Sequence, residues 1–169
     1  MQDALYRELA DEFSAALERL ASAWEHDPDR RKDLIQEIHV ALWRSLERWQ
    51  GDCSRRTWVY RVAHNVAVTH VLRSRRDLLR SAISLDEMEI ARDDDVEEAL
   101  DEKRMRARLL AAIRRLAPLD RQVALLYLEG IDASGIGEVT GLSASNVATK
   151  IHRLKRVLGG KQGRTRYVG

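Results

Sequence analysis

Hydrogen-bonding side chains gather on one face of residues 143–158. At about 100° per residue, this face carries five of them: Ser145, Thr149, His152, Arg153 at its edge, and Arg156. Hydroxyl, imidazole and guanidinium groups of these sizes reach base edges in the major groove of DNA. The segment contains no acidic residue, whereas an ordinary surface helix more often alternates Glu and Lys. The pattern therefore favours a helix that reads DNA.

Apolar residues at helical spacing position this face. Four of them, at i, i+4, i+7 and i+11, form one stripe of a helix: Val147, Ile151, Leu154 and Leu158. Before the stripe, Gly141 can adopt the positive φ of a tight turn, and Ser143 is a favourable N-cap. Gly137 would allow a preceding helix to cross closely. Residues 132–158 therefore predict a helix-turn-helix.

Charge divides the 169 residues into three segments, although the net charge is only +2. Residues 1–76 contain 13 Lys or Arg and 12 Asp or Glu, residues 77–103 contain 3 and 11, and residues 104–169 contain 13 and 4. The basic C-terminal segment favours a polyanion as its partner. Helix-forming residues dominate and no segment alternates as a half-buried strand would. We expect an all-α fold of two small helical domains joined by a flexible acidic linker.

Cysteine content and the lack of long apolar runs indicate the cellular compartment of the protein. The single cysteine excludes an internal disulfide framework and suits a reducing cytoplasm. The first residues mix acids and bases, unlike a signal peptide, and no apolar run reaches membrane-spanning length. We therefore expect a cytoplasmic protein that does not interact with a membrane.

The first domain is expected to contain three helices and one polar turn: helices over residues 6–24, 33–49 and 57–76, and the turn over residues 50–54. Trp58 and Tyr60 lie among arginines, and such interleaving can stack unpaired bases while neutralising phosphates. Aromatic residues also dominate protein cores. We expect Trp24, Trp43 and Trp49 in the core, whereas core and surface positions stay open alternatives for Trp58.

Three motifs carry a resemblance to a known family. They are Asp33-Leu-Ile-Gln-Glu with Leu42-Trp43, then Thr57-Trp-Val-Tyr-Arg-Val-Ala-His-Asn65, and the Leu116-Ala-Pro-Leu-Asp-Arg121 run before the helix-turn-helix. In order and spacing they resemble a bacterial RNA polymerase sigma factor of the extracytoplasmic-function (ECF) group. Such a protein binds core RNA polymerase and directs promoter recognition, DNA melting and transcription initiation.

The resemblance implies a role for each part of the chain. Residues 1–76 would bind the polymerase clamp and the promoter minus-10 element. Residues 77–103 would form the acidic linker, and residues 104–169 would bind the minus-35 element and the polymerase flap. Core RNA polymerase and promoter DNA are the expected partners, and an anti-sigma factor or other regulator is left open as a further one.

The resemblance also assigns roles to single residues. The clamp-docking face consists of Asp33, Gln36 and Glu37. The pocket for a flipped minus-10 base and the adjoining single-strand path consist of Gln50, Gly51, Asp52, Cys53, Ser54, Trp58, Arg61 and Asn65. Together with Arg156 of the outward face, the minus-35 contacts are Ser145, Asn146, Thr149, Lys150, His152 and Arg153. Three basic residues stand where the family usually has acids and weaken the negative docking face: Arg30, Arg31 and Lys32.

Other classes of protein fit the sequence less well. A conventional helix-turn-helix transcriptional regulator is the alternative, but it would leave the pattern of residues 33–76 unused. It would also normally carry a dimerisation element or a ligand domain. An enzyme is disfavoured because the five histidines and Cys53 lack metal-ligand spacing, and no nucleophile elbow or phosphate loop occurs. We expect no metal and no cofactor. A purely structural interaction module is the third option.

Overall fold

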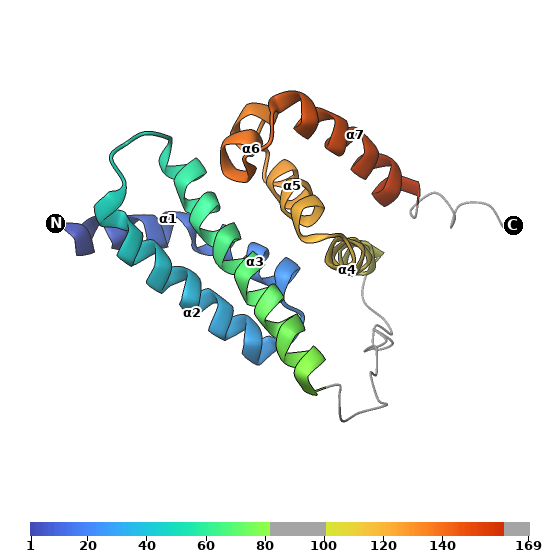
Figure 1. The fold of residues 1–169 in the computed structure, drawn as a ribbon, viewed down its shortest axis with the longest axis horizontal. Helices are drawn as coiled ribbons and strands as arrows, with labels where there is room; N and C mark the ends of the chain where they lie inside the picture. The colour runs from blue at the N-terminus through green and yellow to red at the C-terminus, as the bar shows by residue number, and fades with distance from the viewer. Residues whose placement is uncertain (82–100, 161–169) are drawn as a thin grey trace, which may run out of the picture.

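A computed structural model describes residues 1–81 and 101–160, and every regular element in these stretches is helical. In chain order the elements are α1 (Gln2–Trp24), α2 (Pro28–Ser45), the 3-10 turn η1 (Leu46–Arg48), α3 (Arg55–Ser81), α4 (Asp101–Arg114), α5 (Pro118–Leu128), α6 (Ala133–Thr140) and α7 (Ala144–Gly160). Helices α1–α3 form one group and α4–α7 a second group beside it (Figure 1). The all-α, two-domain expectation is confirmed.

Helices α1, α2 and α3 pack into a bundle that follows the apolar stripes of the sequence. On α2, the residues Leu34, Ile38 and Leu42 are buried. The start of this helix is set by Asp27, whose carboxylate accepts hydrogen bonds from two backbone N–H groups of the first turn. Pro28 takes the first helical position, where its missing N–H costs nothing. Local capping therefore separates α1 from α2.

The four tryptophans of this bundle do not share one environment. Trp24 and Trp58 are 3% and 7% exposed, and Trp49 is half-buried with its ring centroid 6.0 Å from that of Trp58. The core prediction is confirmed for Trp24 and Trp49. It is wrong for Trp43, which is 44% exposed. Trp43 lies one position past the buried stripe of α2, about 100° around the helix, and its indole N–H donates to Asp3 at 3.1 Å.

The second group packs four short helices around a small core. Its fully buried apolar side chains include Ile113, Leu126, Ile136 and Val147. Arg121 closes the corner between α4 and α5, because its guanidinium donates to the carbonyl oxygens of Arg114 and Leu116. Burial lowers the pKa of Arg121 to about 10. The arginine of the third sequence motif thus holds this corner.

The two groups of helices contact each other directly. Helix α6 lies beside α3, and α4 lies beside α1 (Figure 1). The guanidinium of Arg121 lies 4.8 Å from the ring centroid of Trp24 on α1, within the range of a cation–π interaction. Arg114 of α4 donates to the backbone carbonyl of Ser22 on α1 at 2.6 and 3.1 Å. The protein therefore adopts a closed arrangement of its two domains.

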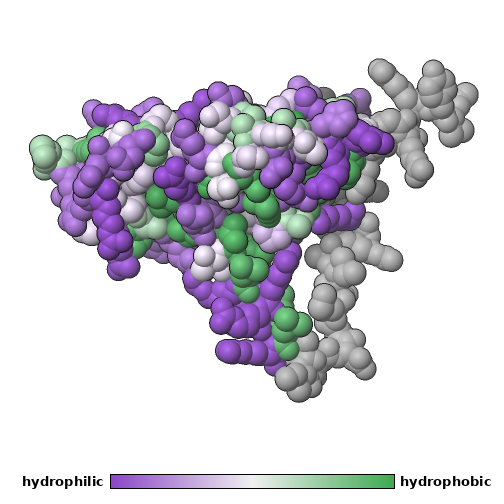
Figure 2. All heavy atoms as spheres, turned by 45° about the horizontal axis from the view of Figure 1, so that its top comes forward, coloured by the Kyte–Doolittle hydropathy of each residue, from purple (hydrophilic) through white to green (hydrophobic). Residues whose placement is uncertain are grey.

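The surface is mainly polar. Figure 2 shows hydrophilic side chains over most of the drawn face, with apolar side chains at the protruding end of α3. The exposed apolar residues of this part of α3 are Leu72, Leu78 and Leu79. None of the helices in the described ranges is long and apolar enough to cross a membrane.

The ends of the predicted linker are helical. Helix α3 continues to Ser81 and α4 begins at Asp101, so both helices enter the predicted range 77–103. The other residues of that range, 82–100, lie outside the described residues. The C-terminal tail, 161–169, also lies outside them.

A buried histidine makes the stability of the fold depend on pH. His64 is 1% exposed, and its ring centroid lies 5.9 Å from that of Trp24 and 6.3 Å from that of Tyr60. Burial lowers the pKa of His64 from 6.5 to about 3. The unfolded chain therefore takes up a proton below pH 6.5, whereas the folded chain does not. Because of this difference, we expect the free energy of unfolding to fall by about 2 kcal/mol when the pH is lowered from 7 to 5.

Urea unfolding at these two pH values measures the effect. His64→Gln removes the titrating ring and should flatten the pH dependence by the same amount. The matched control is His152→Gln, because His152 is exposed on α7, and this variant should keep the wild-type dependence. The same loss of stability in His64→Gln as in the wild type would show that His64 is not the titrating group.

Candidate nucleic-acid interface

The helix-turn-helix predicted from residues 132–158 is present. Helix α6 is capped by Asp132, whose carboxylate accepts the backbone N–H of Gly135 at 2.7 Å. It ends at Gly141, which has φ +81° and therefore the left-handed conformation that favours glycine. The hydroxyl of Ser143 then accepts the backbone N–H of Asn146 at 3.1 Å, at the start of α7. These local features orient α7 on the surface of the second domain.

The two faces of α7 differ as its sequence predicts. Val147 and Leu154 are buried, and Ile151 and Leu158 are half-buried against the core. The exposed residues on the other side include Ser145, Asn146, Thr149, His152, Arg153 and Arg156. This surface offers hydroxyl, amide, imidazole and guanidinium groups, which can bond to bases and phosphates.

Lys150 differs from its neighbours on α7. It is half-buried, and its Nζ lies 2.7 Å from Oδ1 of Asp120 on α5. Arg153 is farther from the same oxygen, at 3.8 Å, and its side chain is 62% exposed. Asp120 thus offsets the positive charge of Lys150 and attaches α7 to α5. Sequence reasoning missed this contact because its partners are 30 positions apart.

A second polar surface lies at the turn before α3. Gln50, Gly51, Asp52 and Ser54 are exposed, and Cys53 is half-buried. The positive φ of Gly51, +82°, allows the chain to reverse here. The hydroxyl of Ser54 accepts the backbone N–H of Thr57 at 3.1 Å and so orders the start of α3.

The other three residues assigned to the minus-10 surface, Trp58, Arg61 and Asn65, lie in three different environments. Trp58 is buried beside Trp49 and is not presented for stacking on a base. Arg61 donates through Nε and Nη2 to the carbonyl oxygen of Glu138 in α6, at 3.2 and 2.9 Å. Asn65 is exposed, but it lies ten residues after Arg55, about 15 Å along α3. The structure therefore does not bring Asn65 to the turn.

Asn65 instead lines a groove between α2 and α3. The open groove has a volume of about 850 Å³, and all three residues of the predicted docking face also line it: Asp33, Gln36 and Glu37. Arg73 lines the same groove from α3. Arg44 of α2 also lines it, so two carboxylates, two amides and two guanidiniums share one accessible surface.

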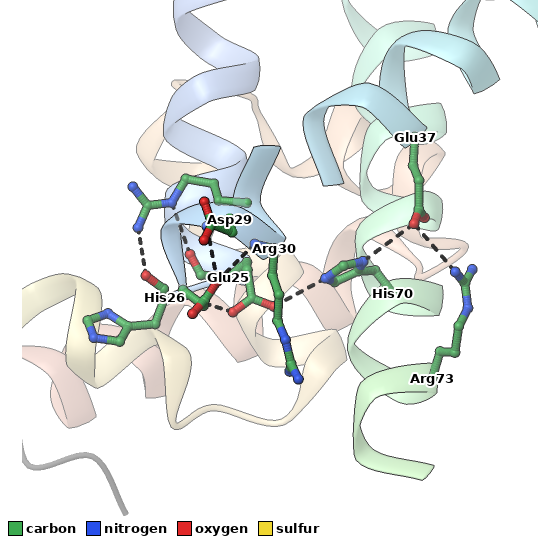
Figure 3. Close-up of polar contacts among 9 residues, drawn as sticks. Glu25, His26, Asp29, Arg30, Glu37, His70 and Arg73 are labelled. Carbon is green, nitrogen blue, oxygen red and sulfur yellow. Dashed lines mark hydrogen bonds and ion pairs between the residues drawn. The ribbon is translucent and has the colours of Figure 1, made fainter. Parts of the chain in front are cut away.

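Glu37 is held in place by α3 (Figure 3). Its Oε1 lies 3.4 Å from Nη1 of Arg73 and 3.8 Å from Nδ1 of His70. His70 is buried, and its Nε2 lies 3.1 Å from Oε2 of Glu25, at the end of α1. Arg73 offsets much of the charge of Glu37, whereas Asp33 is exposed and forms no ion pair with any described residue. Sequence reasoning had not connected His70 or Arg73 with this surface.

These surfaces carry mainly polar and charged side chains. Across residues 1–81 and 101–160, no group of three or more His, Cys, Asp or Glu side chains could hold a metal ion. Two separate surfaces, the outer face of α7 and the turn before α3, carry groups of the types that can hydrogen-bond to nucleic acids.

Two families match the two groups of helices. Residues 9–77 match sigma-70 region 2, and residues 106–158 match sigma-70 region 4. The first match covers most of α1–α3, and the second covers most of α4–α7.

Individual proteins resemble the chain over most of its length. It is 29% identical to the ECF RNA polymerase sigma factor SigE of Mycolicibacterium smegmatis over 157 residues, covering 92% of this chain and 59% of SigE. It is 29% identical to the ECF RNA polymerase sigma factor SigL of Mycobacterium tuberculosis over 159 residues, covering 92% of this chain and 87% of SigL. The chain thus spans about three fifths of SigE and most of SigL.

A solved structure shares the fold. It is the sigma factor RpoE in complex with the anti-sigma factor NepR from Bartonella quintana, with a TM-score of 0.72 and 16% sequence identity. The likeness covers 94% of this chain and 95% of RpoE. Both groups of helices therefore occur together in a known fold.

The close approach inside the helix-turn-helix gives a stability prediction. A Cβ added to Gly137 would lie 2.6 Å from the backbone carbonyl oxygen of Leu142, which cannot move away as a flexible side chain could. Gly137→Ala should lower the free energy of unfolding by about 1–3 kcal/mol, the usual cost of overpacking.

The matched control is Gly159→Ala in α7, where a Cβ would meet no atom within 4 Å. This variant should be neutral or gain up to about 1 kcal/mol of helix propensity. Chemical unfolding followed by circular dichroism compares the two. If Gly137→Ala is as stable as Gly159→Ala, the backbone of Leu142 in the turn does not approach α6 as closely as the structure indicates.

Proposed function

The chain belongs to the extracytoplasmic-function group of bacterial RNA polymerase sigma factors, and on this premise we propose that it binds core RNA polymerase and directs promoter recognition, DNA melting and transcription initiation. The observation that carries the proposal is the presence of both sigma-70 regions, 9–77 and 106–158, in this order in one chain. A conventional helix-turn-helix regulator would use only the second region, so residues 9–77 argue against that alternative.

In this proposal the groove between α2 and α3 docks on the polymerase clamp. Its support is the accessible surface that contains Asp33, Gln36 and Glu37. The paired state of Glu37 makes Asp33 the main source of free negative charge there. The neighbouring Lys32 is exposed and opposes it.

The turn over residues 50–54 receives a flipped base of the minus-10 element. Exposed polar groups and the compact Gly51 leave room for a base edge. Trp58 supports the turn from the core side together with Trp49. Arg61, about one and a half helical turns after the start of α3, contributes cationic charge to the adjoining single-strand path. Because Asn65 lies about 15 Å away along α3, the base pocket consists of the turn without it.

The second domain binds duplex DNA on one side and protein on another. The outer face of α7 reads the minus-35 element. A largely apolar pocket of about 230 Å³, lined by α4, α5 and α7, offers the polymerase flap an apolar contact. The likeness to RpoE, which was crystallised with an anti-sigma factor, supports a regulator of that kind as a further partner. The polymerase supplies the chemistry of transcription, and the chain acts with it in the cytoplasm.

Transcription in vitro tests the proposed function. Purified core polymerase with this chain should produce transcripts from specific promoters, whereas core polymerase alone should not. Asp33→Lys should lower the affinity for core polymerase at least tenfold, because it reverses the free charge of the docking face. Lys32→Glu, a matched change one position earlier, should raise that affinity. No promoter-specific transcript from any template of the source genome would contradict the function, and equal affinities of the variants would contradict the docking face.

The outer face of α7 should separate base reading from phosphate binding. A Thr149→Ala, His152→Ala double variant should relax the sequence preference for the minus-35 element, because each good base contact contributes about 1–3 kcal/mol of discrimination. Arg153→Ala should weaken the binding of all sequences alike and reduce its salt dependence. Sequence selection with the holoenzyme measures both. An unchanged preference in the double variant would remove these residues from base reading.

A further inference from the structure

Helix α5 contacts both lysines of α7. Nζ of Lys150 lies 2.7 Å from Oδ1 of Asp120, in the first turn of α5. Nζ of Lys155 lies 5.0 Å from the ring centroid of Tyr127, near the end of α5 and within the range of a cation–π interaction. The two arginines of α7, by contrast, are exposed. The lysines of this helix are therefore engaged by a neighbouring helix of the same domain.

The ion pair of Asp120 with Lys150 is partly shielded from solvent. The two side chains are 23% and 22% exposed, so salt screens their attraction less than that of a fully exposed pair. Nζ also donates a hydrogen bond to the carboxylate, and a hydrogen bond between charged groups is among the stronger ones. A lysine held in this way attracts a phosphate group less than a free lysine does. The carboxylate beside it repels one.

The pair lies at the edge of the surface proposed to read DNA. Lys150 is one position after Thr149 of the outer face, about 100° around the helix. Arg153, three positions later, lies on the same flank, and its Nη2 is 3.8 Å from the same oxygen of Asp120. When a helix reads base edges in the major groove, basic side chains at its margins are placed to contact the phosphates. Asp120 therefore lies where phosphate contacts are expected.

We propose that Asp120 limits the sequence-independent affinity of α7 for duplex DNA, because it keeps the charge of Lys150 from the phosphates. The inference rests on the proposed function and deepens it. Phosphate contacts strengthen binding to every sequence alike, so a free lysine here would hold the chain on DNA without a promoter. Non-specific sites far outnumber promoters in a genome. Weaker binding to them leaves more of the chain free to reach its targets.

This assignment changes the role of Lys150. The family resemblance places it among the minus-35 contacts, whereas the ion pair makes it a positioning residue that attaches α7 to α5. Arg153 keeps its place at the DNA, because its side chain is 62% exposed and its distance to Asp120 is longer. The two basic residues of one flank thus differ in what they offer to a phosphate.

Fluorescence anisotropy with the full chain tests the proposal. The probe is a fluorescein-labelled duplex of about 30 base pairs and mixed sequence, titrated at several salt concentrations between about 0.05 and 0.2 M. Asp120→Asn removes the negative charge but keeps the size of the side chain and an acceptor oxygen. This variant should bind the probe about threefold or more tightly at the lowest salt. The slope of log K against log salt should steepen by about 1, because one more phosphate is neutralised.

A second substitution shows whether Lys150 is the source of the gain. Lys150→Met removes the charge and keeps an unbranched stem. In the Asp120→Asn background it should lower the affinity about threefold or more and restore the wild-type salt slope. In the wild-type background it should lower the affinity less than about twofold. This difference is the coupling that a double-mutant cycle measures.

Glu138→Gln is the matched control. It removes the same charge from α6, where the exposed side chain forms no hydrogen bond or ion pair with any described residue. Any gain in affinity from this control should be the same with Lys150 and with Lys150→Met. Circular dichroism melts of all variants detect a loss of folding. A merely structural role of Asp120 would lower the affinity and would not steepen its salt dependence.

Two results would overturn the proposal. One is an equal salt slope for the wild type and Asp120→Asn. The other is an equal effect of Lys150→Met in both backgrounds, which would make Lys150 a direct phosphate contact. If the slope and the coupling follow the expectation but core polymerase never initiates with this chain, only the proposed function fails.

Discussion

Guanidinium groups that take their hydrogen-bond acceptors from the opposite domain hold the closed chain together. Arg19, Arg56 and Arg61 reach from the first domain to the second, and Arg114 reaches back to the carbonyl of Ser22. A guanidinium that leaves water needs such acceptors, because it has five N–H donors and cannot lose its charge. Each domain also has its own buried apolar residues. The buried apolar residues of both domains form one continuous cluster, so the contact between the domains is apolar as well as polar.

This constraint connects the shape of the protein with its function. Arg61 has an acceptor in α6, and it lies six residues after Arg55, the first residue of α3, about 9 Å along that helix. The docking face of α2 and the outer face of α7 do not supply these contacts, so closure leaves both accessible. Polymerase can therefore engage the closed chain first.

Sequence patterns predicted the features that depend on nearby residues. The stripe from Val147 to Leu158, the positive φ of Gly141 and the cap at Ser143 are local, and each is present. The helix expected over 33–49 begins earlier, at Pro28, because Asp27 caps it, and its last turn becomes η1. Features set by distant partners could not be predicted: Trp43 bonds to Asp3 at the surface instead of entering the core.

The same limit applies to the candidate sites. The residue types on α7 and in the turn over 50–54 were visible in the sequence, but the ion pair of Lys150 with Asp120 was not. The contact of Arg19 with Glu129 joins residues 110 positions apart, and no local pattern marks either of them. Burial of Trp58 likewise depends on Trp49, which lies across a turn. Long-range pairing decided which of the predicted residues are free to bind.

The central claim is that the free chain is closed and opens on the polymerase. Distances between spin labels at Ser14→Cys on α1 and Ser134→Cys on α6, in a Cys53→Ser background, measure this directly. Both labelled positions are exposed in the structure. The account predicts one narrow, short distance distribution for the free chain and a longer one with core RNA polymerase. A broad, long distribution in the free chain, or the same short distance on the polymerase, would contradict it.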